Sequence, residues 1–427
     1  MNSPCQRNAR IAADKTSVEH YFRAMFSSRL SEKEYKTWVT IGRVLLAILG
    51  AYIIAKSYGK GNDINVYLHA GGQIISGEDP YIENPFNNYL YSPLFALLMA
   101  PFSFLGLPIA RVIWALFNCF LIYRTWNIFK LHSGYMQRMS QRNQVLLVAC
   151  SALLAFNSFN HNLILGQMTV LMLWMVAESL HRITRGQWLL GAMVLALGIN
   201  IKVIPLFALG YLLLDQRYKA LGFSLLGLLL FMALPAIVLG WEANMALHQH
   251  WIEVINPFKS KFGLEINDGC VSLNCLWSRL EGDASVLSTL TNVSRLIVIL
   301  LFSYYMFARR RYSDSLRFWR EFSLVMMAII LFFPHQMKYT MLFILPAAMY
   351  FLFGFLQSES SARRRPVYYL LGFCFILPAI IGRDIIGNTA TDFFDTIGLM
   401  GILNVIVFVM LVFWKPNTLE EEAVISS

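Results

Sequence analysis

The chain has 427 residues, of which 57% are hydrophobic and only 14% are charged. This composition excludes an ordinary soluble globular protein and places the chain among multi-span membrane proteins. The formal net charge of +10 does not indicate a nucleic-acid partner, because Lys and Arg in a membrane chain mainly report its orientation.

Residues 1–38 are polar and basic and form the expected cytosolic N-terminal tail, without the pattern of a cleaved signal peptide. Apolar runs of membrane-spanning length predict about twelve transmembrane helices within residues 39–415. Their expected ranges are 39–58, 109–129, 143–158, 166–181, 187–201, 203–216, 219–240, 288–308, 319–334, 338–356, 366–382 and 396–414. Residues 416–427 follow as an expected cytosolic C-terminal tail.

Two long polar stretches are expected to be outer loops, residues 59–108 and residues 241–287. Within the first loop, residues 93–105 are apolar but too short to cross a bilayer, so we expect a juxtamembrane helix on the membrane surface. Counting this helix as a crossing would also place the basic clusters 309–311 and 363–365 outside. With both termini in the cytosol, most of the 35 Lys and Arg residues face inward.

The six cysteines do not together form a metal-binding or disulfide framework. Cys270 and Cys275 differ from the others because both fall in the second outer loop, where an oxidising compartment permits a bridge. A disulfide and two free thiols both stay open at this point. No metal site is expected, and the sequence does not say whether a metal is required.

Polar and ionisable residues gather at the outer ends of the expected spans, and such residues persist near hydrocarbon mainly where they face a cavity. Asp63 follows the first span beside Asn62, where its carboxylate is placed to accept a proton from a hydroxyl. The alternative for Asp63 is an ordinary interfacial carboxylate that caps a loop helix. The sequence therefore offers a candidate general base.

Basic residues interrupt two of the apolar regions at the same outer side. Lys202 either snorkels to the interface or pairs with an anion such as a lipid phosphate. His335 and Lys338 follow Pro334, and both side chains are able to donate charge-assisted hydrogen bonds to phosphate oxygens. The alternative for His335 is an ordinary loop histidine.

Amide and imidazole side chains occupy a polar hinge expected between two spans, at Asn160, His161 and Gln167. Amides both donate and accept hydrogen bonds, which suits sugar hydroxyls, although such residues are also common in loops. Asn267, in the second outer loop, belongs to the same polar set. The sequence contains no Gly-rich phosphate loop, which favours a donor carried on a lipid over a nucleotide sugar.

A series of stretches follows in a particular order along residues 40–415. They are Asp63-Ile64-Asn65-Val66-Tyr67, YSPLFALLMAPFSFLGLPIARVIWALFN, Leu165-Gly166-Gln167, RGQWLLGAMVLALGINIKVIPLF, SLNCLW and His335. In this order the chain resembles glycosyltransferase family 87, the polyprenyl-phosphate-mannose-dependent mannosyltransferases of the GT-C superfamily. The resemblance implies an all-α polytopic membrane protein with the GT-C fold.

The resemblance also implies an inverting transfer of a sugar, mannose in the family, from a polyprenyl-phosphate donor to a hydroxyl at the outer face of the cell membrane. Asp63 would then act as general base, and Lys202 and His335 would meet the donor phosphate. Lys338 is a third candidate for binding the donor phosphate. The candidates for sugar and acceptor contacts are Asn62, Tyr67, Asn160, His161, Gln167 and Asn267. No cofactor is expected besides the lipid-linked donor, and the acceptor is a glycolipid, a glycan or a protein.

Three other functions stay open: a transporter or lipid flippase, a non-catalytic assembly subunit, and a membrane ligase that uses a diphosphate lipid. A transporter predicts matching halves and charges near the bilayer midplane, whereas the polar residues here lie at the outer edge. An assembly subunit would tolerate the loss of Asp63 and His335 together.

Overall fold

The computed structural model describes residues 62–82, 86, 88–132, 139–256, 269–280, 282–309, 316–334, 336–357 and 365–414, with scattered helical positions between residues 36 and 55. Several expected features lie outside the described residues. They are nearly all of the N-terminal tail, most of the span 39–58, the C-terminal tail, and the candidates His335 and Asn267. Over the described ranges the regular structure is helical, apart from one isolated bridge between Cys270 and Met337.

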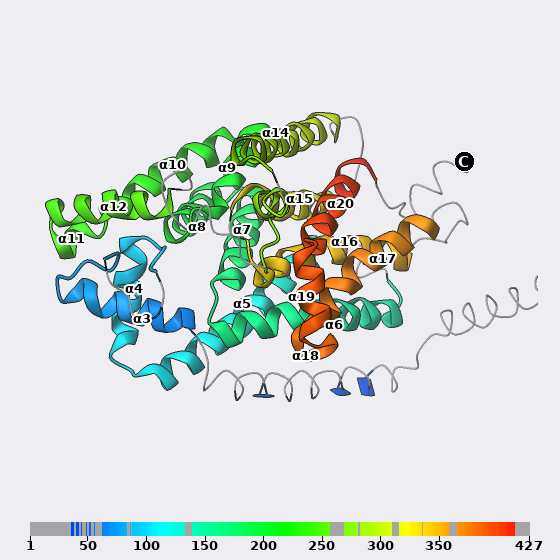
Figure 1. Ribbon diagram of the computed structural model, residues 1–427, viewed down its shortest axis with the longest axis horizontal. Coiled ribbons are helices and arrows are strands. Elements are labelled where there is room, and N and C mark those ends of the chain that lie inside the picture. The colour runs from blue at the N-terminus through cyan, green and yellow to red at the C-terminus, as the bar shows by residue number, and fades with distance from the viewer. Residues whose placement is uncertain are drawn as a thin grey trace, which may run out of the picture.

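The helices are described in chain order, and the long stretches between α3 and α4 and between α12 and α13 belong to the two expected outer loops. The N-terminal half holds α3 (Asn62–Ile75), α4 (Pro93–Ser103), α5 (Leu107–His132), α6 (Gln141–Leu165), α7 (Thr169–Thr184), α8 (Trp188–Ile201), η1 (Ile204–Leu206), α9 (Phe207–Leu214), α10 (Tyr218–Ala233), α11 (Ala236–Leu239) and α12 (Trp241–Ile255). The C-terminal half holds α13 (Leu273–Trp277), α14 (Ala284–Ala308), α15 (Arg317–Phe332), η4 (Lys338–Ile344), α16 (Leu345–Gln357), α17 (Arg365–Ile380), α18 (Arg383–Ile386), α19 (Asn388–Thr396) and α20 (Leu399–Phe413). Figure 1 shows α3, α4, α11 and α12 at one end of the molecule and α17 to α20 toward the other.

Five helical segments of the described chain are long and apolar enough to cross a membrane. They are Leu107–His132, Gln141–Leu165, Tyr218–Leu239, Ala284–Ala308 and Lys338–Leu356, and the pair α19 and α20, bent by 57°, makes a sixth if it counts as one span. The chain is therefore a polytopic membrane protein. Shorter apolar helices also fall on expected spans, and the total of twelve crossings stays a prediction.

The two expected outer loops contain helices that the sequence analysis did not anticipate. The first holds α3 in addition to α4, and the second holds α12 and α13. Helix α4 coincides with the apolar stretch expected to form a helix at 93–105; Ser92 caps it by accepting a hydrogen bond from the N–H of Phe95, and Pro93 occupies its first turn. Its position at a membrane surface stays a prediction.

The prediction of a polar hinge around Asn160 is wrong, because α6 continues as a helix to Leu165. The amides do not break this helix, since Asn162 Nδ2 donates both to the carbonyl of Ser158 one turn earlier and to the carbonyl of Tyr339, each over 2.8 Å. The turn comes at Gly166, which has a φ of 74°. A Cβ atom at Gly166 would lie 3.0 Å from Cβ of Ile64, so this glycine also permits close packing against α3.

Buried charged pairs mark one end of the bundle. Asp215, after α9, accepts from Arg217 Nε over 2.7 Å, and Glu321 on α15 accepts from Arg317 Nε over 2.7 Å. The guanidinium of Arg309 contacts both carboxylates. Lys202 lies at the opposite end of the η1–α9 segment from Asp215. The Asp215 and Glu321 ion pairs and Lys202 therefore lie at different ends of this helical segment.

Helices α3 and α4 pack backbone to backbone at Gly71. The Cβ of an alanine at Gly71 would lie 2.9 Å from the backbone nitrogen of Ala100, whereas an alanine at Gly72 would meet no atom within 4 Å. We expect Gly71→Ala to destabilise the protein by about 1–3 kcal/mol through overpacking. Gly72→Ala should stabilise it by up to about 1 kcal/mol, because alanine favours the helix.

Thermal unfolding of the purified protein measures this difference, with Gly72→Ala as the matched control. The expected result is a lower apparent Tm for Gly71→Ala than for the control. An equal or higher Tm for Gly71→Ala would contradict the tight packing of α3 on α4.

Candidate functional site

Asp63 lies in the first turn of α3, with its side chain half-buried at the junction of α3 with the connection from α6 to α7. Burial raises the pKa of the Asp63 carboxyl to about 6, and the Lys202 ammonium limits this rise. A carboxyl with such a pKa is ionised above pH 6 and is a stronger base than an exposed aspartate. The position of Asp63 therefore gives it the properties of a general base.

Lys202 follows the last turn of α8 and precedes η1. Its Nζ lies 5.5 Å from the centroid of the Tyr91 ring, and Asp63 interacts with it electrostatically without coming within ion-pair distance. Among the described residues, no carboxylate forms an ion pair with Lys202, so its charge is available to an anion that enters beside Asp63.

A tyrosine layer beside these two groups consists of Tyr67, Tyr81 and Tyr91. The hydroxyls of Tyr67 and Tyr91 lie 3.0 Å apart in a hydrogen bond, and the two rings meet edge to face with centroids 4.9 Å apart. Tyr81 OH donates to the carbonyl of Tyr91 over 2.8 Å. Burial raises the pKa of Tyr67 and of Tyr91 well above the usual range, so both hydroxyls stay protonated.

A buried hydrogen bond connects this tyrosine layer to the segment that carries Lys202. Ser92 Oγ donates to Asn200 Oδ1 over 2.9 Å, and both side chains are fully buried. Ser92 also caps α4, as described above, so the same side chain fixes the start of α4 against the end of α8. Asn200 Nδ2 is buried without a hydrogen-bond partner, which leaves one amide donor unused next to Lys202.

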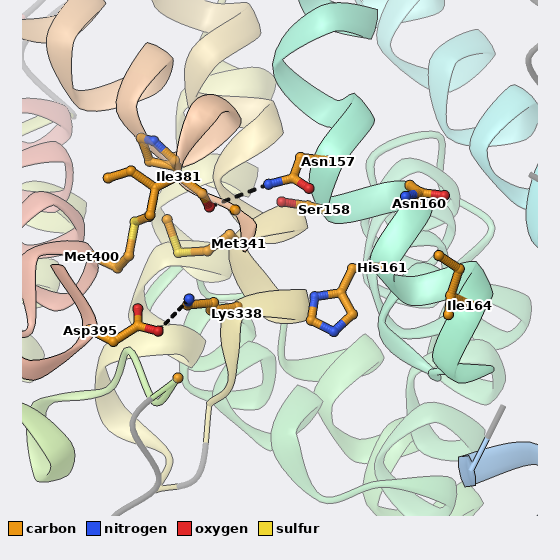
Figure 2. A pocket seen from close by; sticks show the side chains of 13 residues that line it. Asn157, Ser158, Asn160, His161, Ile164, Lys338, Met341, Ile381, Asp395 and Met400 are labelled. Carbon is orange, nitrogen blue, oxygen red and sulfur yellow. Dashed lines mark hydrogen bonds and ion pairs between the residues drawn. The ribbon is translucent and has the colours of Figure 1, made fainter. Parts of the chain in front are cut away.

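A separate cavity of about 360 Å³ lies between the C-terminal half of α6, the start of η4, and the α17–α19 region. Its polar lining includes Asn157, Ser158, Asn160, His161, Lys338 and Asp395. In Figure 2 the Lys338 side chain points to Asp395, and the Nζ to Oδ2 distance is 2.5 Å. Asp63 and Lys202 do not line this cavity.

Tyr339 has neighbours both among the cavity residues and at Asp63. Its ring meets the ring of His161 edge to face, with centroids 6.5 Å apart. The Asp63 carboxylate interacts electrostatically with the Tyr339 hydroxyl. Tyr339 therefore connects His161, a residue of the cavity lining, with the Asp63 carboxylate.

A disulfide joins Cys270 to Cys275 in the second outer loop. The segment beginning at Gly269 pairs with the chain before η4: Val271 N–H donates to Gln336 O over 2.6 Å, and Lys338 N–H donates to Gly269 O over 3.0 Å. Arg279 also donates to the carbonyl of Cys270 over 2.8 Å. The bridged loop therefore holds in place the segment that carries Lys338.

A family model for glycosyltransferase family 87 matches residues 89–334, more than half of the chain. The chain belongs to glycosyltransferase family 87. No curated protein matches the chain, and no solved structure does. The protein is therefore an enzyme that transfers a sugar from a donor to an acceptor. Membership in this family does not favour the transporter or the assembly subunit.

The structure brings some of the candidate residues named from the sequence together and places others apart. Asp63, Tyr67 and Lys202 lie around the tyrosine layer, whereas Asn160, His161 and Lys338 line the cavity. Gln167 is buried just after Gly166, with its Oε1 atom unpartnered. Asn62 begins α3, and His335 and Asn267 lie outside the described residues.

Sequence reasoning missed Tyr91, Tyr339 and Asp395 in this glycosyltransferase. Aromatic residues are frequent throughout the chain, so nothing in the pattern distinguished the two tyrosines. The one available signal for Asp395 was its place in the amphipathic helix α19, which directly precedes the last apolar helix. In the part of the chain that the structure describes, no group of three His, Cys, Asp or Glu residues is placed to hold a metal ion.

Proposed function

We propose that this glycosyltransferase moves a sugar, mannose by resemblance, from a polyprenyl-phosphate donor to a hydroxyl acceptor on the outer face of the membrane. The observation that carries the proposal is a half-buried Asp63 carboxylate beside the Lys202 ammonium, which pairs with no carboxylate among the described residues. The protonated hydroxyls of Tyr67 and Tyr91 lie next to them. A base next to a free cation suits a reaction in which a hydroxyl loses its proton while a phosphate leaves.

In the proposed reaction, Asp63 takes the proton of the acceptor hydroxyl as its oxygen attacks the anomeric carbon of the donor sugar. The bond from that carbon to the phosphate oxygen breaks, and the polyprenyl phosphate leaves with the electron pair. A single displacement of this kind inverts the anomeric configuration. Lys202, with His335, stabilises the charge that grows on the phosphate.

Lys338 was also expected to bind the donor phosphate. Its ammonium already pairs with Asp395 over 2.5 Å, so its charge is largely neutralised before any ligand arrives. We therefore assign phosphate binding to Lys202 and His335 and give Lys338 a different role below.

The proposed orientation places Asp63 in the compartment outside the cytosol. The Cys270–Cys275 disulfide lies in the loop that pairs with the chain directly before Tyr339. Structural disulfides persist in oxidising compartments, which favours an outward-facing position for this loop. The cluster around Arg309, Arg317 and Arg217 lies at the opposite end of the helices, as the positive-inside tendency expects for a cytosolic face. These two observations support the proposed orientation of a multi-pass cell-membrane enzyme with both termini inside.

The pKa of Asp63 leads to an expected pH dependence. Because the carboxylate must be deprotonated to accept the hydroxyl proton, and its pKa is raised to about 6, kcat/KM should fall as the pH drops below about 6. The expected slope is about tenfold per pH unit. A pH profile of kcat/KM measures it, and a flat profile between pH 4.5 and 7 would contradict Asp63 as the base.

A donor panel tests the proposed function. Purified protein is incubated with prenyl-phosphate mannose, prenyl-phosphate glucose, GDP-mannose and UDP-glucose, together with a membrane extract as the source of acceptors. The expected result is release of prenyl phosphate from one of the lipid donors and no turnover of the nucleotide sugars. Turnover of a nucleotide sugar alone would overturn the proposed donor class.

A further inference from the structure

The cavity between α6, η4 and the α17–α19 region is built from fixed polar groups. Asn160 and Asp395 line it, and their side chains are 8% and 6% exposed. Asn160 Oδ1 is buried without a hydrogen-bond partner. An unpartnered buried acceptor costs free energy unless a ligand or water donates to it, so this cavity is prepared for a polar occupant.

The charges of the cavity cancel within it. Lys338 and Asp395 form an ion pair, with side chains 21% and 6% exposed. The remaining ammonium protons of Lys338 are donors, and the carboxylate lone pairs of Asp395 are acceptors. Asn157 adds a further amide, whose Nδ2 lies 3.4 Å from the carbonyl of Ile381. The lining therefore offers both donors and acceptors, and its ion pair carries no net charge that selects an anion.

We propose that this cavity binds the neutral polyhydroxyl headgroup of the acceptor, a sugar residue of a glycolipid or glycan. The proposal rests on the function proposed above. Each sugar hydroxyl both donates and accepts, so a ring of hydroxyls matches a lining that holds both donors and acceptors better than a phosphate does. A volume of about 360 Å³ is at the small end of the ~300–1,000 Å³ range of ligand pockets, which suits a short headgroup.

The position of the cavity supports the same role. Tyr339 meets the ring of His161, which lines the cavity, and it also interacts electrostatically with the Asp63 carboxylate. A headgroup in the cavity would lie beside Tyr339, from where a hydroxyl has a short path to Asp63. The donor phosphate, held at Lys202, would approach from the tyrosine layer instead.

The test separates the KM for the acceptor from the KM for the donor. Octyl α-mannoside and octyl β-glucoside serve as acceptor probes and prenyl-phosphate mannose as donor, with the protein in lipid nanodiscs. The double variant Lys338→Met/Asp395→Leu removes both charges together, so no uncompensated buried charge remains. Asn160→Ala is a second variant that leaves the ion pair in place.

Both variants should raise the acceptor KM at least tenfold and change the donor KM less than twofold. Thr396→Val, an exposed residue next to Asp395 on α19, should change neither. A raised donor KM would assign the cavity to the donor and overturn the proposal, and so would unchanged values of both constants. Hydrolysis of the donor by wild-type protein without transfer to either octyl glycoside would also overturn it, while leaving the proposed donor class intact.

If wild-type protein does not turn over any prenyl-phosphate sugar, the proposed function fails, and the binding of octyl α-mannoside then decides on the cavity by itself. Isothermal titration should show binding to wild-type protein and at least tenfold weaker binding to the double variant. Equal affinities, or absence of binding to wild-type protein, would overturn the assignment of the cavity to a sugar.

Discussion

Asp63→Asn should lower kcat for sugar transfer by about 10²–10⁴-fold, because a carboxamide has no basic lone pair for the acceptor proton. The change keeps the size of the side chain, so α3 and the tyrosine layer should pack as before. Donor binding should therefore stay within about twofold of the wild-type value. Initial rates with a prenyl-phosphate sugar, together with direct binding of the same donor, measure both expectations.

Asp79→Asn is the matched control for this variant. Asp79 lies in the same outer loop, but its carboxylate pairs with Nδ1 of His250 over 2.8 Å and accepts from the N–H of Tyr81 over 2.9 Å. We expect it to transfer sugar at a rate close to that of wild-type protein. Full activity of Asp63→Asn would remove Asp63 from the mechanism, and equal losses in both variants would indicate a structural effect of the loop.

Lys202→Met should reduce kcat/KM for the donor by about 10- to 100-fold, mainly through a higher donor KM. The reason is the loss of a charge-assisted hydrogen bond to the phosphate, worth about 1.5–3 kcal/mol. The variant should also change the pH profile. Since the Lys202 ammonium lowers the pKa of Asp63, its removal should move the acid limb of kcat/KM to higher pH.

Lys219→Met is the corresponding control. Lys219 also stacks over an aromatic ring, with Nζ 4.7 Å from the Trp188 centroid, but it is far along the chain from the tyrosine layer, at the start of α10. It should keep the donor KM and the acid limb of wild-type protein. An unchanged donor KM together with an unshifted acid limb in Lys202→Met would contradict phosphate binding at this lysine.

The sequence predicted an all-helical membrane protein, and it placed Asp63 and Lys202 near each other. Apolar runs located most helices within a few residues, because hydrocarbon requires long apolar segments with all backbone groups bonded internally. The expectation that Asp63 and Lys202 lie at the same side of the membrane follows from counting crossings. The structure brings these two charges into electrostatic contact, although Lys202 lies 139 positions after Asp63.

The remainder of the site depends on tertiary contacts that no local pattern reveals. Asn160 and Asn162 looked like residues of a hinge, yet α6 stays helical because Asn162 bonds across to Tyr339. Lys338 looked like a free cation at a loop, but Asp395 from α19 neutralises it. The partner lies 57 positions later, so only the packing of α19 beside η4 determines the role of Lys338.

The central claim is that Asp63 acts on a sugar whose phosphate is held by Lys202. A cryo-EM structure with a non-transferable prenyl-phosphonate mannose analogue tests it most directly. We expect the phosphonate within hydrogen-bond distance of Lys202 Nζ, the anomeric carbon on the side that faces Asp63, and the prenyl chain in the lipid. A phosphonate bound at the Arg309 cluster, or a sugar ring remote from the Asp63 carboxylate, would contradict the account.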